Sequence, residues 1–133
     1  MKHIALAFAL TAALAPAAHA VEYTQVQADK SRIGFGYQQM GVSMDGSFKK
    51  FTSQLRFDPA APTAAKSTIE VDLASVDTGS SEGDAEVATK TWFNAKAFPT
   101  ARFESTSVKA LGDNKYEVAG KLTIKGTSRD VVV

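Results

Sequence analysis

The sequence contains no cysteine, and its only two histidines, His3 and His19, stand close to the N-terminus. A chain without cysteine offers no thiol nucleophile and no disulfide, so the core alone must hold the fold. If the histidines are removed with a leader, a histidine-dependent triad and a zinc site with imidazole or thiolate ligands are excluded as well. We therefore expect no catalytic residue, no bound metal and no resident cofactor.

Residues 1–20 have the form of a cleavable signal peptide. A short basic start precedes an apolar run that Pro16 ends, and small residues lead up to Ala20. The run is too short to span a bilayer as a helix, which argues against the alternative of a membrane anchor. We expect cleavage after Ala20, export to the periplasm and a mature domain at residues 21–133.

The predicted mature chain has no excess of positive or negative charge. Loss of Lys2 with the signal peptide reduces the 15 basic residues to 14, equal to the 14 acidic ones. Nucleic-acid binding depends on clustered Lys and Arg, so no nucleic-acid partner is expected. The length supports one domain.

Alternation of apolar and polar residues with the period of a β-strand runs through the mature sequence. The predicted strands lie at 32–38, 51–57, 68–73 and 116–124, with weaker candidates at 21–27, at 102–111 and from 129 onward. The predicted turns are Met44-Asp45-Gly46, Asp58-Pro59, Gly112-Asp113-Asn114 and Lys125-Gly126-Thr127. An antiparallel sheet of many short strands with one apolar face must close into a barrel or fold into a sandwich.

One segment departs from this period. Between Ser81 and Trp92, Ala85, Ala88 and Trp92 share one helical face, and Ser81 and Asp84 have the spacing of a capping box. We predict a short helix across an end or side of the sheet.

Eight stretches of the mature chain, in this order and spacing, carry a family resemblance. They are SRIGF at 31–35, MGVS at 40–43, GSFKKF at 46–51, LRFDP at 55–59, ASVDTG at 74–79, FPT at 98–100, FEST at 103–106 and GKLTIKGT at 120–127. Together they resemble the YceI-like family of periplasmic lipid-binding, or polyisoprenoid-binding, proteins. The resemblance implies an all-β, lipocalin-like antiparallel barrel whose interior holds a long isoprenoid tail, with no established catalytic activity.

The sequence departs from the family pattern at several positions. Gln39 and Lys30 stand where members often have histidine. The helical segment reads Gly-Asp-Ala-Glu-Val at 83–87, where members usually have Arg-Asp followed by His-Leu. The chain also stops within a strand at 131–133, where family members continue through further strands. We therefore expect a divergent member whose barrel is incomplete in this chain. Its unpaired edges should make residues 21–133 poorly soluble or pair edge to edge into a homodimer or larger species.

Aromatic side chains are the most informative candidates for a binding site. For each one alone the packed core is the default interpretation. Together they could form the wall of a cavity, because a barrel of about eight strands can hold one small ligand. The candidate ligand-binding residues are Phe35, Tyr37, Phe48, Phe51, Leu55, Phe57, Val71, Trp92, Phe93, Phe98 and Phe103.

Three other interpretations are weaker. Asp77-Thr78-Gly79 resembles the loop of aspartic proteases, which would need a homodimer to supply a second aspartate, and the alternative is a polar turn. The acidic residues at 77, 82, 84 and 86 lack the spacing of an EF-hand calcium loop. Lysines at 49 and 50, or Lys30 with Arg32, could receive an anionic headgroup, although a solvated surface is the better explanation of exposed lysines.

The sequence thus favours a periplasmic carrier of an amphipathic lipid: an isoprenoid, a quinone-like lipid or a fatty acyl chain. The alternative from another class is an envelope stress or electron-transport accessory protein that acts through a membrane partner. Either protein would make transient contact with a membrane or a membrane protein.

Overall fold

The computed structural model describes residues 21–133, and the predicted signal peptide lies outside the described residues. The strands in this range are β1 (Ile33–Gln39), β2 (Val42–Phe48), β3 (Phe51–Arg56), β4 (Lys66–Asp72), β5 (Val76–Asp77), β6 (Thr100–Gly112), β7 (Lys115–Ile124) and β8 (Thr127–Val132). The helical elements are α1 (Ser81–Val87) and the 3₁₀ turns η1 (Ala28–Lys30), η2 (Pro62–Ala64) and η3 (Leu73–Ser75).

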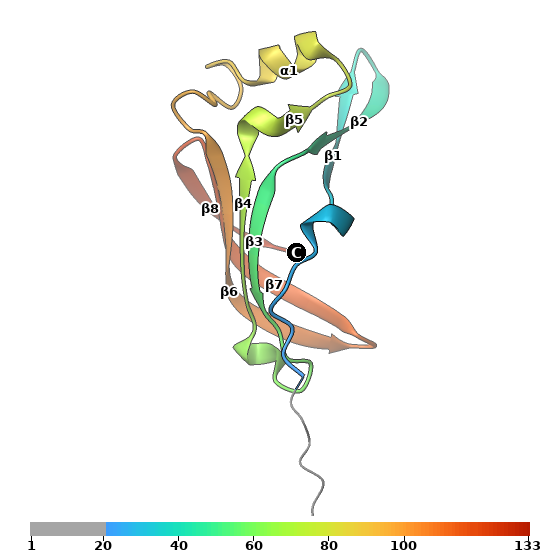
Figure 1. The fold of residues 1–133 in the computed structure, drawn as a ribbon, viewed down its shortest axis with the longest axis vertical. Helices are drawn as coiled ribbons and strands as arrows, with labels where there is room; N and C mark the ends of the chain where they lie inside the picture. Colours follow the sequence, from blue (N-terminus) through green and yellow to red (C-terminus); the bar gives the residue numbers. More distant parts are fainter. Residues whose placement is uncertain (1–20) are drawn as a thin grey trace, which may run out of the picture.

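The strands form two antiparallel sheets. One sheet has three strands in the order β1-β2-β5, and the other has five in the order β3-β4-β6-β7-β8. Figure 1 shows α1 beside β5 at one end of the molecule and the long β6–β7 hairpin reaching towards the opposite end. The prediction of an all-β antiparallel fold with one short helix is confirmed, and within the described residues the sheets do not close.

The two sheets are continuous through a bend. Phe48 pairs with Val76 on one side of the bend, and Phe51 pairs with Val71 on the other. The intervening stretch is longer at 72–75 than at 49–50, and the excess forms η3. Leu73 in η3 is only 1% exposed, the most buried side chain of the described core. A buried apolar side chain, Leu73, thus lies at the bend where the two sheets meet.

The two faces of the five-stranded sheet differ in polarity. Residues that pair across antiparallel strands point to the same side. One face, here called the inner face, carries mostly apolar residues: Phe51, Leu55, Ile69, Val71, Ala101, Phe103 and Leu122. The opposite face carries ion pairs, with Arg102 Nη1 2.8 Å from Glu70 Oε1 and Lys121 Nζ 2.9 Å from Asp130 Oδ1. This alternation follows the predicted period of two.

Three hairpins close through two-residue turns in which both residues have positive φ. The turn residues are Met40-Gly41, Asp113-Asn114 and Lys125-Gly126. This geometry is that of type I′ turns, whose twist matches that of the flanking strands. The predicted turns at 112–114 and 125–127 are confirmed, whereas the turn that joins β1 to β2 was missed.

The predicted turn at Met44-Asp45-Gly46 is wrong, because these residues lie inside β2. Gly46 pairs with Phe35, and a Cβ atom built on Gly46 would lie 2.3 Å from Cζ of the Phe35 ring. The glycine is there to let an aromatic ring cover the neighbouring strand, not to turn the chain.

The helix is shorter than predicted. It ends at Val87, so Trp92 lies beyond it, and its N-cap is Ser80, whose Oγ accepts a hydrogen bond of 3.0 Å from the Gly83 N–H. The segment 21–27 forms no strand, although Tyr23 makes one bridge to Phe57. No helix in residues 21–133 is long and apolar enough to cross a membrane.

Candidate functional site

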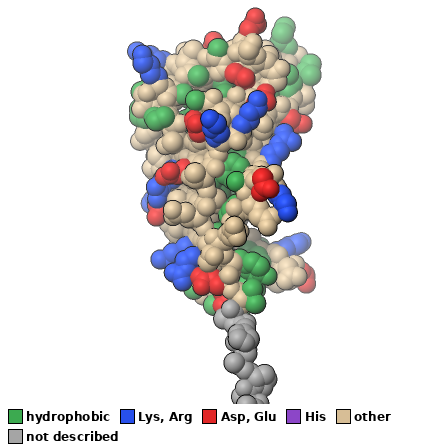
Figure 2. Space-filling view, viewed as in Figure 1, with side chains coloured by type: hydrophobic (Ala, Val, Ile, Leu, Met, Phe, Trp, Pro, Cys, Tyr) green, Lys and Arg blue, Asp and Glu red, His purple; other side chains and the backbone are tan. Residues whose placement is uncertain are grey.

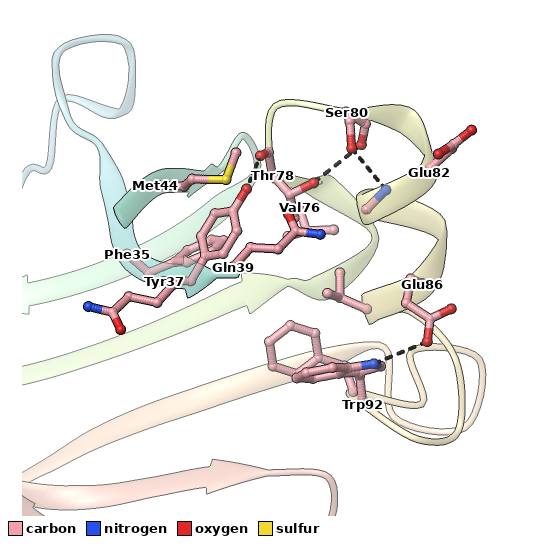
Figure 3. Close-up of a pocket in the computed structure, with 14 residues that line it drawn as sticks. Phe35, Tyr37, Gln39, Met44, Val76, Thr78, Ser80, Glu82, Glu86 and Trp92 are labelled. Atoms are coloured by element: carbon pink, nitrogen blue, oxygen red, sulfur yellow. Dashed lines mark hydrogen bonds between the residues drawn. The ribbon is translucent and has the colours of Figure 1, made fainter. Parts of the chain in front are cut away.

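A cavity of about 480 Å³ lies between the three-stranded sheet and α1 with the loop that follows it (Figure 3). Its walls come from four places in the sequence: β1 and β2, β5 with the turn that follows it, α1, and the loop at 92–93. The lining residues are Phe35, Tyr37, Gln38, Gln39, Met44, Val76, Thr78, Ser80, Glu82, Gly83, Glu86, Val87, Trp92 and Phe93.

The floor of the cavity is a face of the β1–β2 hairpin. Phe35 and Tyr37 are two residues apart on β1, so they point to the same side, and Met44 pairs with Tyr37 from β2. The Tyr37 hydroxyl donates a hydrogen bond to the carbonyl of Thr78, in the turn after β5 on the opposite side of the cavity. The ring of Tyr37 is thereby fixed across the cavity (Figure 3).

Aromatic rings continue from this floor towards the interior. The centroids of Phe35 and Phe48 are 5.3 Å apart, and those of Phe48 and Phe93 are 6.1 Å apart. These spacings are typical of favourable tilted and edge-to-face contacts. Phe48 therefore connects the sheet side of the cavity to the loop side.

The opposite wall is positioned by a network at the start of α1. The Asp84 carboxylate accepts hydrogen bonds from the Thr78 N–H at 2.7 Å and from the Thr78 hydroxyl at 2.8 Å. Thr78 is almost completely buried, so this carboxylate fixes the turn after β5 to the helix. At the other end of α1, Trp92 Nε1 lies 3.3 Å from Glu86 Oε1, which orients the indole at the mouth.

The charged residues that line the cavity, Glu82 and Glu86, are both acidic. Gln38 and Gln39 add neutral amides from β1, and the lining contains no Lys or Arg. The site thus combines an apolar interior with a rim of amides and carboxylates.

The structure gathers four of the predicted site residues in this cavity, namely Phe35, Tyr37, Trp92 and Phe93, with Phe48 in contact behind them. The others lie elsewhere. Phe51, Leu55, Val71 and Phe103 lie on the inner face of the five-stranded sheet.

Two predicted site residues lie at the ends of the molecule. Phe57 packs edge to face on Tyr116, with centroids 5.1 Å apart, near the turn that follows β3. Phe98 lies against the β7–β8 turn, where a Cβ on Gly126 would be 3.0 Å from its Cε1 atom. Phe98 therefore packs beneath a hairpin, outside the cavity lining.

Sequence reasoning missed several lining residues. Met44 was assigned to a turn, and Val76, Thr78 and Val87 were not singled out. Two glycines, at 41 and 46, could each have marked the turn. Placing the turn at Gly41 puts Met44 in the following strand, opposite Tyr37. Thr78 could not be found from local sequence, because its role depends on Asp84.

Asp77 has a structural explanation that does not involve proteolysis. Its Oδ1 accepts a hydrogen bond from the Gly79 N–H at 3.0 Å, as predicted for a polar turn, and its Oδ2 lies 3.1 Å from Lys49 Nζ. The Gly79 N–H, and next the Lys49 ammonium, lower the pKa of the Asp77 carboxyl below its ordinary value. These contacts keep Asp77 ionised and do not favour the protease hypothesis.

The neighbouring acidic and basic residues also have partners. Asp84 is engaged with Thr78, and Lys49 with Asp77. Within residues 21–133, no three acidic, histidine or cysteine side chains gather as metal ligands would. The aromatic cavity is therefore the arrangement in this part of the chain that most resembles a binding site.

Comparison with known proteins is consistent with this geometry. The YceI-like domain pattern matches residues 24–133. A UPF0312 protein of Photorhabdus laumondii is 38% identical over 102 residues, which are 76% of this chain and 53% of that protein. A UPF0312 protein of Azotobacter vinelandii is 31% identical over 137 residues, which cover 100% of this chain and 71% of that protein.

Solved structures show the same fold. The crystal structure of Burkholderia cenocepacia BcnA matches with a TM-score of 0.79 and 42% identity, over 82% of this chain and 69% of that one. A Campylobacter jejuni YCEI protein matches with a TM-score of 0.65 and 26% identity, over 84% and 66%. This chain spans about half the length of the Photorhabdus relative. From the domain match and these relatives, the chain belongs to the YceI-like family.

Proposed function

We propose that this protein binds an amphipathic lipid, an isoprenoid or a quinone-like molecule, with its apolar tail in the aromatic cavity. The observation that carries the proposal is the convergence of Phe35, Tyr37, Phe93 and Trp92 on one cavity of about 480 Å³. Ligand sites in proteins are typically concave and lined by apolar side chains with a few polar groups at defined places.

The aromatic side chains continue from the cavity onto the inner face, so a long tail could lie along them. Phe48 contacts Phe35 and Phe93 and stands at the bend, and Phe51 begins the inner face beyond it. The aromatic side chains along this course are only half buried, so they retain surface that a tail could cover. A short tail would occupy the cavity, and a longer one would continue along the inner face.

The energetics are sufficient for useful affinity. Burial of apolar carbon contributes about 0.8 kcal/mol per methylene-sized group. Micromolar binding needs about 8 kcal/mol, and ordering of the tail opposes part of the gain. A few isoprene units therefore suffice.

The test is a titration with farnesol, a short isoprenoid alcohol, followed by the fluorescence of Trp92, the only tryptophan in the chain. We expect saturable binding by the parent and at least tenfold weaker binding by Phe35→Ala, from about 2 kcal/mol of lost contact. Lys49→Ala should change the affinity little. If a folded Phe35→Ala variant binds as tightly as the parent, the cavity is not the site.

Phe57→Ala is the matched aromatic control. Phe57 lies outside the cavity lining, so its truncation should spare farnesol binding. It should weaken binding of a polyprenol long enough to follow the inner face past the end of β3, where Phe57 lies. Circular dichroism must show that each variant is folded, because a Phe→Ala change costs about 3–5 kcal/mol of stability.

The location of the protein is part of the proposal. The basic start, apolar run and small residues of positions 1–20 support export to the periplasm. Mass spectrometry of the protein from the periplasmic fraction should find Val21 at the N-terminus. An intact Met1 in the cytoplasmic fraction would contradict it.

A further inference from the structure

The tip of the β1–β2 hairpin carries an apolar side chain that contributes nothing to the core. Met40, at the first position of the type I′ turn, has φ +51° and is 97% exposed. Asn, Asp and Gly are the residues that favour this position. The other two type I′ turns of the described chain have a charged residue at this position, Asp113 and Lys125.

An apolar track connects this tip to the cavity. The register pairs Gln39 with Val42 and Tyr37 with Met44, so Val42 lies on the same face as the cavity floor. Exposure increases steadily outward, from 37% at Met44 to 61% at Val42. Hydrophobic side chains gather at the corner of Figure 2 where Figure 1 places this hairpin.

The tip of the hairpin and all of β1 are also uncharged, and Asp45 is the first charged residue along β2. From Ile33 to Met44 the sequence contains no Asp, Glu, Lys or Arg. Transfer of a charged side chain into a bilayer is costly, and that cost is absent here. The carboxylates Glu82 and Glu86 at the cavity rim would disfavour an anionic surface.

From these observations we propose that the β1–β2 hairpin tip inserts into the surface of a neutral lipid bilayer, and that the lipid tail enters the cavity along the Met40–Val42–Met44 track. The proposal rests on the proposed function and adds the partner and the route of the ligand. The occupant is a bilayer because the tip is apolar, uncharged and continuous with the site that must receive the tail.

The experiment is flotation of the purified protein with phosphatidylcholine vesicles, together with the rate of uptake of a polyprenol held in those vesicles. The variant is Met40→Asn with Val42→Thr. Asparagine favours the positive φ of the turn and threonine suits a strand, so the hairpin should fold at least as well. The control is Leu111→Thr, which removes an exposed apolar side chain beside a different hairpin turn.

We expect the parent to float with the vesicles and to be insensitive to added salt. The double variant should lose about tenfold or more in vesicle affinity and uptake rate, since two apolar side chains no longer enter the bilayer. The control should behave as the parent. Binding of farnesol added from solution should be unchanged in all three proteins.

Three results would overturn the proposal. The first is a parent that binds farnesol but not vesicles, which leaves the cavity function intact. The second is equal vesicle binding by the parent and the double variant. The third is conversion of a dimer into a monomer by the double substitution, which would make the tip an interface between copies of the chain. Loss of farnesol binding by the parent would instead contradict the proposed function itself.

Discussion

At the scale of single residues, two glycines are set by the aromatic rings that cover them. A Cβ on Gly46 would lie 2.3 Å from the Phe35 ring, and a Cβ on Gly120 would lie 2.5 Å from the Phe103 ring. Both distances are far shorter than carbon–carbon contact. Each glycine lets a ring lie flat on the adjacent strand, which orients Phe35 at the cavity and Phe103 on the inner face.

Gly46→Ala should therefore lower the free energy of unfolding by about 1–3 kcal/mol, through displacement of the Phe35 ring. It should also weaken farnesol binding. Gly36→Ala is the matched control, because the nearest atom to a Cβ there is an Asp45 oxygen at 4.0 Å. Urea denaturation of both variants measures the difference. Equal effects would mean that the ring is not held by the glycine.

The pKa of Asp77 predicts a pH dependence of stability. The Gly79 N–H and Lys49 lower this pKa from its ordinary value of 3.8. The contribution to stability is thus fully present above the unfolded pKa and is lost as the pH falls through the folded one. Between about pH 5 and about pH 3, the urea midpoint of the parent should fall more than that of Asp77→Asn.

Lys49→Gln separates the two causes of this shift. The hydrogen bond from Gly79 is the larger cause and remains in Lys49→Gln. On acidification, the urea midpoint of Lys49→Gln should therefore fall less than that of the parent and more than that of Asp77→Asn. Identical pH profiles for the parent and Asp77→Asn would show that the turn does not stabilise the carboxylate.

At the scale of elements, α1 forms one wall of the cavity and needs a specific anchor to keep its position. It spans only Ser81–Val87, and a helix this short is marginal without tertiary anchoring. Asp84 supplies an anchor through its two hydrogen bonds from Thr78. The position of α1 therefore depends on one carboxylate and a buried threonine.

Asp84→Ala should lower the free energy of unfolding by about 1–3 kcal/mol, because it leaves the Thr78 N–H without its acceptor. The Thr78 hydroxyl keeps only its longer contact of 3.2 Å to the Ser80 carbonyl. The control is Glu82→Ala, an exposed acid on the same first turn, which loses only its interaction with the helix dipole. Hydrogen exchange of residues 81–87 should become faster in Asp84→Ala alone. Unchanged exchange there would contradict this role.

The sequence predicted most elements because the strands have one apolar and one polar face. Where it failed, a distant contact decided the outcome. Met44-Asp45-Gly46 has the composition of a turn, yet Gly46 serves the Phe35 ring across the sheet. The helix prediction ran on to Trp92 because helical spacing alone does not mark the end at Val87. The sequence predicted that aromatic residues form the site. Which of them share one cavity depends on how the strands pair, and the sequence alone does not show this.

At the scale of the whole molecule, one bent antiparallel surface presents an aromatic cavity at one end and an apolar inner face beyond it. The buried apolar side chains of the described residues are few, namely Leu73, Val76, Ala101 and Val108, and of these only Leu73 is fully buried. Most large side chains that face inward are half buried. A lipid tail would complete this core, so the bound protein should be more stable than the free one.

The most direct measurement is native mass spectrometry of the purified protein, followed by organic extraction and identification of the ligand. We predict one lipid with an isoprenoid or similar apolar tail per chain, and a lower midpoint of thermal unfolding after its removal. Re-addition of a long polyprenol should restore both the mass and the midpoint. A ligand-free protein that takes up no polyprenol, and whose midpoint polyprenol does not change, would contradict a lipid-binding function.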